Sequence, residues 1–389
     1  MKIEVVIGAN YGDEGKGLFT EYLCRNRLNP LVVLSNGGCQ RGHTVNNVEN
    51  NIRHVFHHFG SGTLLNVPSV YSKTYLLNPI KYIEEKRELE NHGIKPIAFR
   101  APGCLLQLPG DMVINQVLEK SRKENKHGSC GWGIWETILR NQEERLTFED
   151  FSLLDNESKK KLIIELLDWQ IENRLDSIDS LNDELCKIVK SDSFLDHFIS
   201  DFEEMEKDVR LLDTDDLIDV DWSKNGIDVE TIIIENGQGL LLDKNYAPFD
   251  ENNRTDVHST PSQCGLEGSL EAFGNINHVD DIAVNYISRT YFTRHGAGPF
   301  PEMTNDMMFD DKTNICNEYQ DSMRFGKMTD EFAMKLLMRI MNDGYCEEFP
   351  GIKNNLVLTH CNEVEPIKIL KDYAHFLSYE DDSQKVVVQ

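Results

Sequence analysis

The sequence has 389 residues and a mass of 44.7 kDa, with 40% hydrophobic and 9% aromatic residues. This length excludes a peptide module, and the lack of repeats and Pro/Ser-rich linkers favours a single large domain, residues 1–389, with an insertion. No apolar run approaches the roughly 18 residues of a membrane helix, and the net charge of −26 argues against binding to nucleic acid.

Targeting and redox features point to a cytoplasmic protein. Residues 1–7 lack the basic region and long apolar stretch of a secretory signal. The nine cysteines include no C-x-x-C pair, and we expect them to remain thiols in a reducing compartment.

The first predicted elements are a strand, a glycine-rich loop, a helix at residues 15–27 and a second strand. The strands are continuous aliphatic runs, as expected where both faces of a parallel sheet are covered. Such runs occupy residues 4–7, 30–34, 231–234 and 356–358. The pattern predicts an α/β fold of three layers with a mostly parallel central sheet and a modified P-loop.

The loop at residues 8–17 directly follows the first strand, where a helix N-terminus and glycine N–H groups can hold a phosphate. Lys16 adds a cation. The loop is two residues longer than an ordinary P-loop, and Gly17 stands where a Ser or Thr would bind magnesium. It also contains Asp13 and Glu14, which predicts a Mg²⁺ ligand or a general base.

A second glycine-rich loop, residues 36–44, follows the second strand. It places His43 next to Gly42, beyond the carboxyl end of a parallel strand and beside the phosphate loop. Open α/β sheets bind ligands at this edge, so we predict that His43 is catalytic.

The acidic charge is concentrated in one segment. Residues 146–222 carry about 23 acidic and 8 basic side chains, more than half of the net charge. Apolar residues recur there at helical spacing, at Ile171, Leu175, Ile178, Leu181, Leu185 and Ile188. We interpret the segment as a solvated helical insertion; a protein-docking surface is the alternative.

Taken together, residues 8–17 and 36–44 resemble the adenylosuccinate synthetase family, whose patterns are G-x-x-W-G-D-E-G-K-G and N-G-G-x-N-A-G-H-T. Three further segments are similar in the same order. Residues 128–133 match G-T-T-G-R-G, residues 235–243 match E-G-A-Q-G-x-x-L-D, and residues 293–301 match T-R-V-G-x-G-P-F-P. The resemblance covers most of the chain except the acidic segment and the C-terminal tail.

This resemblance implies a two-step ligation. A nucleoside triphosphate phosphorylates O6 of a 6-oxopurine nucleotide, and the amine of L-aspartate then displaces the phosphate. Asp13 would take the proton from purine N1, while His43 and Lys16 would stabilise the transferred phosphoryl group. Asp13 and the carbonyl of Gly42 would hold Mg²⁺.

The resemblance also implies three sets of binding residues and a homodimer. The triphosphate set is Asp13, Glu14, Gly15, Lys16, Gly17, Gly42, His43, Thr44 and Asn362. The purine-monophosphate set is Gln40, Ser129, Cys130, Gln238, Leu242 and Thr255. The aspartate set is Ser322, Met323 and Arg324. Either Arg140 or Arg145 would enter the neighbouring subunit's nucleotide site; the sequence leaves this choice open.

Two departures bear on the phosphoryl donor and on aspartate. The family's guanine-reading T-K-x-D appears here as residues 359–362, ending in Asn362. An amide offers both a donor and an acceptor, which suits adenine, so we expect ATP or dATP rather than GTP. Residues 322–327 correspond to the family's arginine loop. They have Gly326 and Lys327 where two further arginines are usual, which leaves aspartate binding dependent on Arg324.

The acceptor nucleotide is the third departure. The base loop, residues 359–362, and residues 259–261 look like the bacteriophage branch of the family, 2-aminoadenylosuccinate synthase, which uses dGMP. The protein would then be located in an infected host cell. Gln40 and Cys130 also alter the nucleotide pocket, whereas the retained Asp13 leaves IMP open. We expect dGMP, with IMP as the alternative. The rival hypotheses are a non-catalytic nucleotide-gated regulator and a docking module.

Weaker features complete the sequence. His54, His57 and His58 lack cysteine partners at zinc-like spacing, so we interpret them as structural. The tail after Tyr379 lacks the family's terminal S-T-G-P, which leaves its part in the triphosphate site open.

Overall fold

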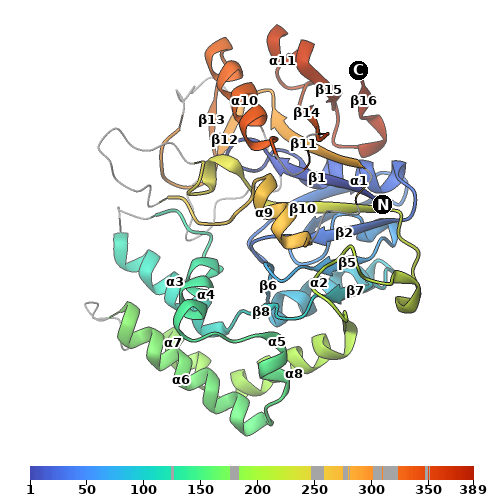
Figure 1. The fold of residues 1–389 in the computed structure, drawn as a ribbon. Helices are drawn as coiled ribbons and strands as arrows, with labels where there is room; N and C mark the ends of the chain where they lie inside the picture. Colours follow the sequence, from blue (N-terminus) through green and yellow to red (C-terminus); the bar gives the residue numbers. More distant parts are fainter. Residues whose placement is uncertain are drawn as a thin grey trace.

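A computed structural model describes residues 1–123, 127–175, 184–246, 258–274, 279, 281–300, 309, 323–346, 349 and 351–389. Within these ranges, ten strands form the main sheet in the order β16-β15-β14-β11-β1-β10-β2-β5-β7-β9 (Figure 1). All neighbours are parallel except β15 and β16. In spatial order the strands are Val387–Val388, Ala374–Leu377, Lys353–Thr359, Asp281–Arg289, Lys2–Gly8, Thr231–Gly239, Pro30–Leu34, Ser69–Tyr71, Ala98–Arg100 and Val209–Leu211.

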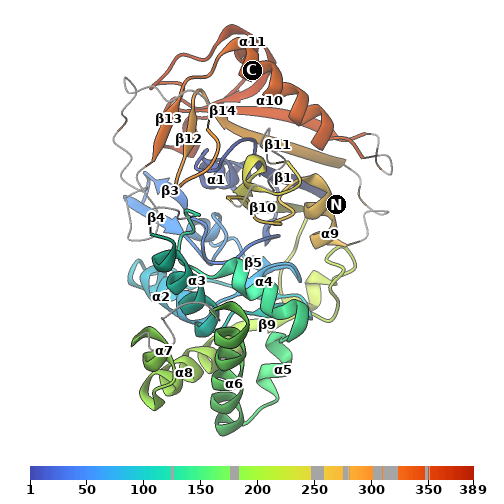
Figure 2. The ribbon, with the colours of Figure 1, turned by 90° about the vertical axis from the view of Figure 1, so that its left-hand side faces the viewer.

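The four predicted strands are β1, β2, β10 and β14, and all run parallel in this sheet; β1, β10 and β2 are adjacent, and β11 separates β14 from β1. Their aliphatic side chains are almost completely buried, as the continuous runs predicted. Helices α1 (Lys16–Asn26) and α9 (Leu266–Phe273) lie on opposite sides of β1 and β10, as Figure 2 shows. The predicted α/β architecture is therefore confirmed.

The remaining helices cover the sheet and extend below it. They are α2 (Pro79–Asn91), α3 (Pro109–Arg122), α4 (Ile134–Glu143), α5 (Phe148–Ser152), α6 (Asn156–Arg174), α7 (Glu184–Val189), α8 (Asp192–Asp208), α10 (Asp330–Asp343) and α11 (Lys368–Tyr373). Among the described residues, three two-stranded sheets accompany them: β3 (His43–Asn47) with β4 (Ile52–Phe56), β6 (Leu76–Leu77) with β8 (Leu105–Leu106), and β12 (Phe292–Arg294) with β13 (Arg324–Gly326).

The acidic segment, residues 146–222, supplies helices α5–α8, which form the lower lobe in Figure 1. Helix α6 ends at Arg174, because Leu175 leaves the helical conformation at φ −116° and ψ 11°. The apolar spacing at residues 171–188, which indicated helix, extends past this end; residues 176–183 lie outside the described ranges, and α7 follows them. The segment also contributes β9, which pairs with β7 at the sheet edge. It is thus attached to the core through a strand as well as through helices.

None of the helices in the described ranges has the length and apolar character needed to span a membrane.

Candidate active site

The glycine-rich loop leaves the middle of the sheet. Gly8, at the end of β1, pairs with Gly239 of β10 and Ile287 of β11, so the loop opens at the carboxyl edge of three parallel strands. Asp13 and Gly15 both have left-handed backbones, at φ 54° and 92°. These turns bring the chain back into α1, whose first residue, Lys16, is only 4% exposed.

Close packing explains why Gly17 replaces the usual hydroxyl residue. A Cβ atom there would lie 2.9 Å from the carbonyl oxygen of Thr44 and 3.0 Å from the Cβ of His43. The first turn of α1 therefore rests directly on the start of β3. This contact joins the two glycine-rich loops.

Glu14 is buried beneath the first loop. Its Oε1 accepts a hydrogen bond from the backbone N–H of Asn10 at 2.5 Å, and its Oε2 has no partner among the described residues. Burial raises the pKa of Glu14 to about 8, although Lys16 and the Asn10 hydrogen bond oppose the shift. A carboxyl group in this state is ready to ionise when a cation approaches.

The second loop contains a histidine–carboxylate pair. His43 Nδ1 lies 2.7 Å from Glu235 Oε1, and both side chains are buried. Glu235 also accepts hydrogen bonds from the backbone N–H of Ser61, at 3.0 Å, and from its hydroxyl. The guanidinium of Arg41 lies 3.7 Å from the same carboxylate. Glu235 is thus held from three sides.

These contacts fix the protonation of the pair. Burial alone would raise the pKa of Glu235, but the charge of Arg41 and the hydrogen bonds from His43 and Ser61 lower it to about 2. Burial lowers the pKa of His43 to about 4, assisted by Lys16 and Arg41 and opposed by Glu235. A neutral imidazole therefore donates from Nδ1 to a carboxylate, and its Nε2, which has no described partner, can take a proton. A phosphate beside Nε2 would favour the imidazolium form.

Glu235, Arg41 and Ser61 were missed as functional residues by the sequence reasoning. For Glu235 a sequence signal exists, because a carboxylate directly follows three isoleucines and so interrupts a buried strand. Arg41 also carries one, because a charged residue stands where the family pattern has alanine. Ser61 gave no signal.

The predicted purine residues lie on loops that meet. A Cβ at Gly38 would be 3.0 Å from the Ile134 side chain, so the second loop touches the start of α4. Within these loops Gln40 Oε1 accepts from the N–H of Gly38 at 2.7 Å, and Ser129 Oγ donates to Asn115 at 2.7 Å.

Gln238 and Leu242 belong to the same region. Gln238 Nε2 donates to the carbonyl oxygen of Leu242 and to Thr260 Oγ1, each at 3.1 Å. Cys130 is half-buried, and burial raises its pKa. Thr255 lies outside the described residues.

Arg324 connects the aspartate and purine segments. Its guanidinium donates to the carbonyl oxygens of Gly296, at 2.6 Å, and Gly298, at 3.0 Å. Gly296 in turn contacts Gly128, since a Cβ at Gly128 would lie 3.0 Å from the Cα of Gly296. Met323 precedes Arg324 and is half-buried. Ser322 lies outside the described residues.

The base loop packs on the phosphate loop. Thr359 Oγ1 donates to the carbonyl oxygen of Glu14 at 2.8 Å, and a Cβ at Gly15 would lie 3.2 Å from Thr359 Cγ2. His360 then adopts φ 57°, and Asn362 is exposed. The structure therefore places Asn362 on the loop that packs against residues 14–15.

The two arginines considered for a neighbouring subunit differ in burial. Arg140 is 0% exposed; it donates to both carboxylate oxygens of Asp111, at 2.8 and 2.9 Å, and to the carbonyl oxygen of Leu106. Arg140 is therefore held inside its own chain by these contacts. Arg145 is exposed.

The C-terminal tail packs against α1. Phe376 makes edge contacts with the rings of Phe19 and Tyr22. Beyond Tyr379, residues 387–388 form β16 and pair with β15. The tail thus supports the helix that follows the phosphate loop.

The two glycine-rich loops carry groups that could hold a divalent cation. The carboxylates of Asp13 and Glu14 and the carbonyl of Gly42 offer the oxygen ligands that Mg²⁺ prefers, and Glu14 Oε2 has no described partner. Among the described residues no three His, Cys, Asp or Glu side chains converge on one point. A magnesium ion there would share its coordination with substrate phosphates.

Comparisons with known proteins agree with this arrangement. A family model described as adenylosuccinate synthetase matches residues 5–335. The adenylosuccinate synthetase of Psychromonas ingrahamii is 30% identical over 303 residues, which cover 76% of this chain but only 63% of that protein. Fully ligated adenylosuccinate synthetase from Plasmodium falciparum has a similar fold, with a TM-score of 0.69, 15% identity and 99% coverage of both chains. The cyanophage S-2L succinoaminodeoxyadenylate synthetase, in a structure bound to dGMP and dATP, also has a similar fold. Its TM-score is 0.57 and its identity 12%, and the match covers 100% of this chain and 95% of that one.

Proposed function

Because the chain belongs to the adenylosuccinate synthetase family, we propose that it is a ligase that joins L-aspartate to C6 of a 6-oxopurine nucleotide. The terminal phosphoryl group of a nucleoside triphosphate moves to purine O6. The aspartate nitrogen then bonds to C6, and the C6–O6 bond breaks with release of inorganic phosphate. The purine N1 proton and one amine proton leave to bases.

The observation that carries this proposal is the joining of the two glycine-rich loops around an oriented histidine. Glu235 holds His43 so that its Nε2 can carry a proton toward phosphate oxygens, and the buried Lys16 supplies a fixed positive charge. Asp13 would accept the N1 proton. A magnesium ion, held by Asp13 and the Gly42 carbonyl, would neutralise charge on the triphosphate.

We propose dGMP as the acceptor and ATP or dATP as the donor. The exposed amide of Asn362 supports the donor assignment, because it can both accept from and donate to an adenine edge. The cyanophage protein of similar fold, which binds dGMP and dATP, supports the acceptor. IMP with GTP or ATP remains the alternative, favoured by the retained Asp13.

The test is an assay of four substrate pairs, dGMP or IMP with ATP or GTP, each with L-aspartate and Mg²⁺. We expect a succinylated product from dGMP and ATP, and none from Asp13→Asn with its unfolding curve unchanged. Turnover with IMP and GTP alone would refute the substrate assignment. Nucleotide binding without aspartate-dependent phosphate release under any pair would instead favour the regulatory protein.

We further propose that two copies share their sites in a homodimer. Two arginines, Arg140 and Arg145, were candidates for entering the neighbouring subunit's nucleotide site. Only Arg145 is at the surface, because Asp111 and the Leu106 carbonyl hold Arg140 inside its own chain.

A further inference from the structure

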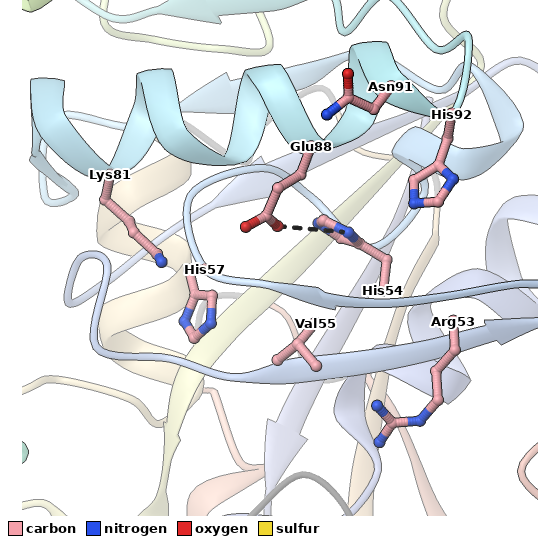
Figure 3. A pocket seen from close by; sticks show the side chains of 8 residues that line it. All are labelled: Arg53, His54, Val55, His57, Lys81, Glu88, Asn91 and His92. Carbon is pink, nitrogen blue, oxygen red and sulfur yellow. Dashed lines mark ion pairs between the residues drawn. The ribbon is translucent and has the colours of Figure 1, made fainter. Parts of the chain in front are cut away.

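A cavity of about 450 Å³ lies between β4 and α2, behind the second glycine-rich loop. Figure 3 shows side chains from the two elements facing each other across it. Its polar lining includes Arg53, His57, Lys81, Glu88, Asn91 and His92. No step proposed above uses this cavity.

The charges of the lining favour an anion. The chain as a whole carries −26, yet among the lining residues Lys81 and Arg53 are cationic and Glu88 is the one carboxylate. Figure 3 shows Glu88 turned toward His54 and the ammonium of Lys81 directed toward His57. Glu88 Oε2 lies 4.0 Å from His54 Nδ1, and the Lys81 ammonium also pairs with the exposed carboxylate of Glu84, at 3.2 Å. Figure 3 also shows Arg53 on the side of β4 turned away from α2, so Lys81 and Asn91 of α2 are the donors nearest the space between the two elements. Together they suit a group that accepts several hydrogen bonds at once, as a phosphate does.

A metal ion or an apolar ligand fits the cavity less well. His54 is already engaged, since its Nε2 lies 3.5 Å from the buried carboxylate of Glu85. No group of three metal-ligating side chains converges in the described ranges. Val55 is the one aliphatic residue of the lining. A small polar anion is the ligand class that remains.

One wall of the cavity is also the back of the catalytic loop. His57 Nδ1 donates to the carbonyl oxygen of Arg41 at 2.5 Å. A Cβ at Gly42 would lie 3.6 Å from Val55 and 3.9 Å from His57. A ligand that moves His57 would therefore act on the loop segment that precedes His43.

The opposite wall reaches the purine side through Lys81. The ammonium of Lys81 lies 5.5 Å from the ring centroid of Trp132, within the range of a cation–π contact. Trp132 belongs to the segment 128–133, and its carbonyl oxygen accepts from Gln107. A ligand that attracts Lys81 would compete with this contact.

From these contacts we propose that the β4–α2 cavity is a binding site for a small phosphate-bearing anion, and that its occupancy is coupled to the two nucleotide loops through His57 and Lys81. The binding part is independent of the proposed function. The coupling part rests on it, because the loops are assigned to the purine nucleotide by that proposal.

Binding is tested with inorganic phosphate and the full-length protein labelled at histidine Cε1 for NMR. Resonances are assigned by single His→Gln variants. Saturable shifts are expected for His57 and His92, whereas phosphate at the triphosphate loop would shift His43. Shifts confined to His43 would overturn the proposal, even in a protein with full ligase activity.

Two variants with opposite expected effects on phosphate affinity sharpen this test. Lys81→Gln should weaken the phosphate-dependent shifts by about tenfold, and Glu88→Gln should tighten them by several-fold, because each changes one charge facing the ligand. Lys95→Gln, an exposed lysine after α2 outside the lining, is the matched control and should have no effect. A loss of structure cannot produce tighter binding, so unchanged affinity in both pocket variants would refute the site.

Coupling is tested by the affinity for dGMP and IMP with and without phosphate, measured calorimetrically in wild type and Lys81→Gln. Direct competition between phosphate and the nucleotide for the nucleotide site should lower the apparent nucleotide affinity equally in both proteins. The wild type should show an additional phosphate-dependent change, which Lys81→Gln lacks, since coupling between sites is reciprocal. Identical phosphate dependence in the two proteins would refute the coupling and leave the binding result unaffected.

Discussion

A single carboxylate decides which protonation state His43 presents to a substrate. Glu235 accepts from His43 Nδ1 at 2.7 Å and stays ionised because Arg41 and two donors of Ser61 surround it. The imidazole is thereby fixed in one tautomer, with Nε2 directed away from the carboxylate. Glu235 is a positioning residue, since its action passes through His43.

We predict that Glu235→Gln lowers kcat by about 10²- to 10³-fold with little change in KM for the nucleotides, as expected when proton transfer is impaired but binding is not. Steady-state kinetics of the four-component reaction measure this. Glu230→Gln, an exposed glutamate one residue before the same strand, should retain wild-type turnover. Equal loss in both variants, or an effect on KM alone, would show that Glu235 does not act through His43.

A second prediction about a single residue concerns the purine base of the nucleoside triphosphate that donates the phosphoryl group. Asn362→Asp replaces an amide by a carboxylate, which accepts from guanine N1 and N2 but repels adenine N1. We expect the ratio of kcat/KM for GTP over ATP to rise by at least about tenfold, the cost of one mismatched hydrogen-bonding group. Competition assays with both triphosphates measure the ratio. An unchanged ratio would remove Asn362 from base recognition.

The sequence pointed to individual site residues only where their local chain is distinctive. Lys16 and His43 lie in glycine-rich loops after buried strands, so both their position and their chemistry could be predicted. Arg41 and Ser61 could not, because they become significant only when β10 places Glu235 beside them. Contacts across some 170 to 190 residues leave no local pattern.

The start of α2 shows how an element depends on one neutral side chain. The N-cap residue Asn78 accepts from the N–H of Lys81 at 2.9 Å, and its own N–H donates to His58 Nε2 at 3.0 Å. His58 is 0% exposed and contacts the hydroxyl of Tyr71 through Nδ1. Protonation of Nε2 would remove the acceptor for Asn78.

This contact gives a pH prediction. Burial lowers the pKa of His58 from 6.5 to about 3. In the unfolded chain the ring takes up its proton near pH 6.5, so the contribution of His58 to stability is complete above that pH and is lost as the pH falls toward 3. We expect His58→Gln to make the acid dependence of the unfolding free energy shallower between these values, by about 1.4 kcal/mol per pH unit at most.

Urea unfolding at pH 4, 5, 6 and 7 measures this slope. His197→Gln, an exposed histidine on α8, is the control and should keep the wild-type slope. A wild-type slope in His58→Gln would mean that other groups carry the acid sensitivity.

Elements were predictable according to their length and position. The aliphatic strands in the middle of the sheet could be found because burial on both faces leaves a continuous apolar run. The three-residue strands β5, β7 and β9 are too short to carry a period. Helix α6 ends at Arg174 although the apolar spacing continues, which shows that spacing alone does not set a helix boundary.

At the scale of the whole molecule, active sites shared between two subunits predict that two inactive variants can restore activity to each other. Arg145→Leu and Asp13→Asn should each be inactive alone, because each removes a different part of every site. Co-expressed in equal amounts, they should recover about a quarter of wild-type activity, since half of the dimers would hold one intact site. Arg210→Leu, which changes an exposed arginine of the edge strand β9, is the control and should retain full activity. A monomer by size-exclusion chromatography, or no recovery, would contradict the shared site.

The position of β1 in the sheet also governs when the protein can begin to bind nucleotides. Its two neighbours are β10 and β11, which lie more than 220 residues later in the chain. During synthesis the phosphate loop therefore emerges early but has no walls until residue 289 has left the ribosome. Strands separated so far in sequence pair slowly, and nascent chains ending before β10 should remain clients of chaperones, insensitive to ATP or dGMP. Nucleotide binding thus reports completion of the fold rather than its initiation.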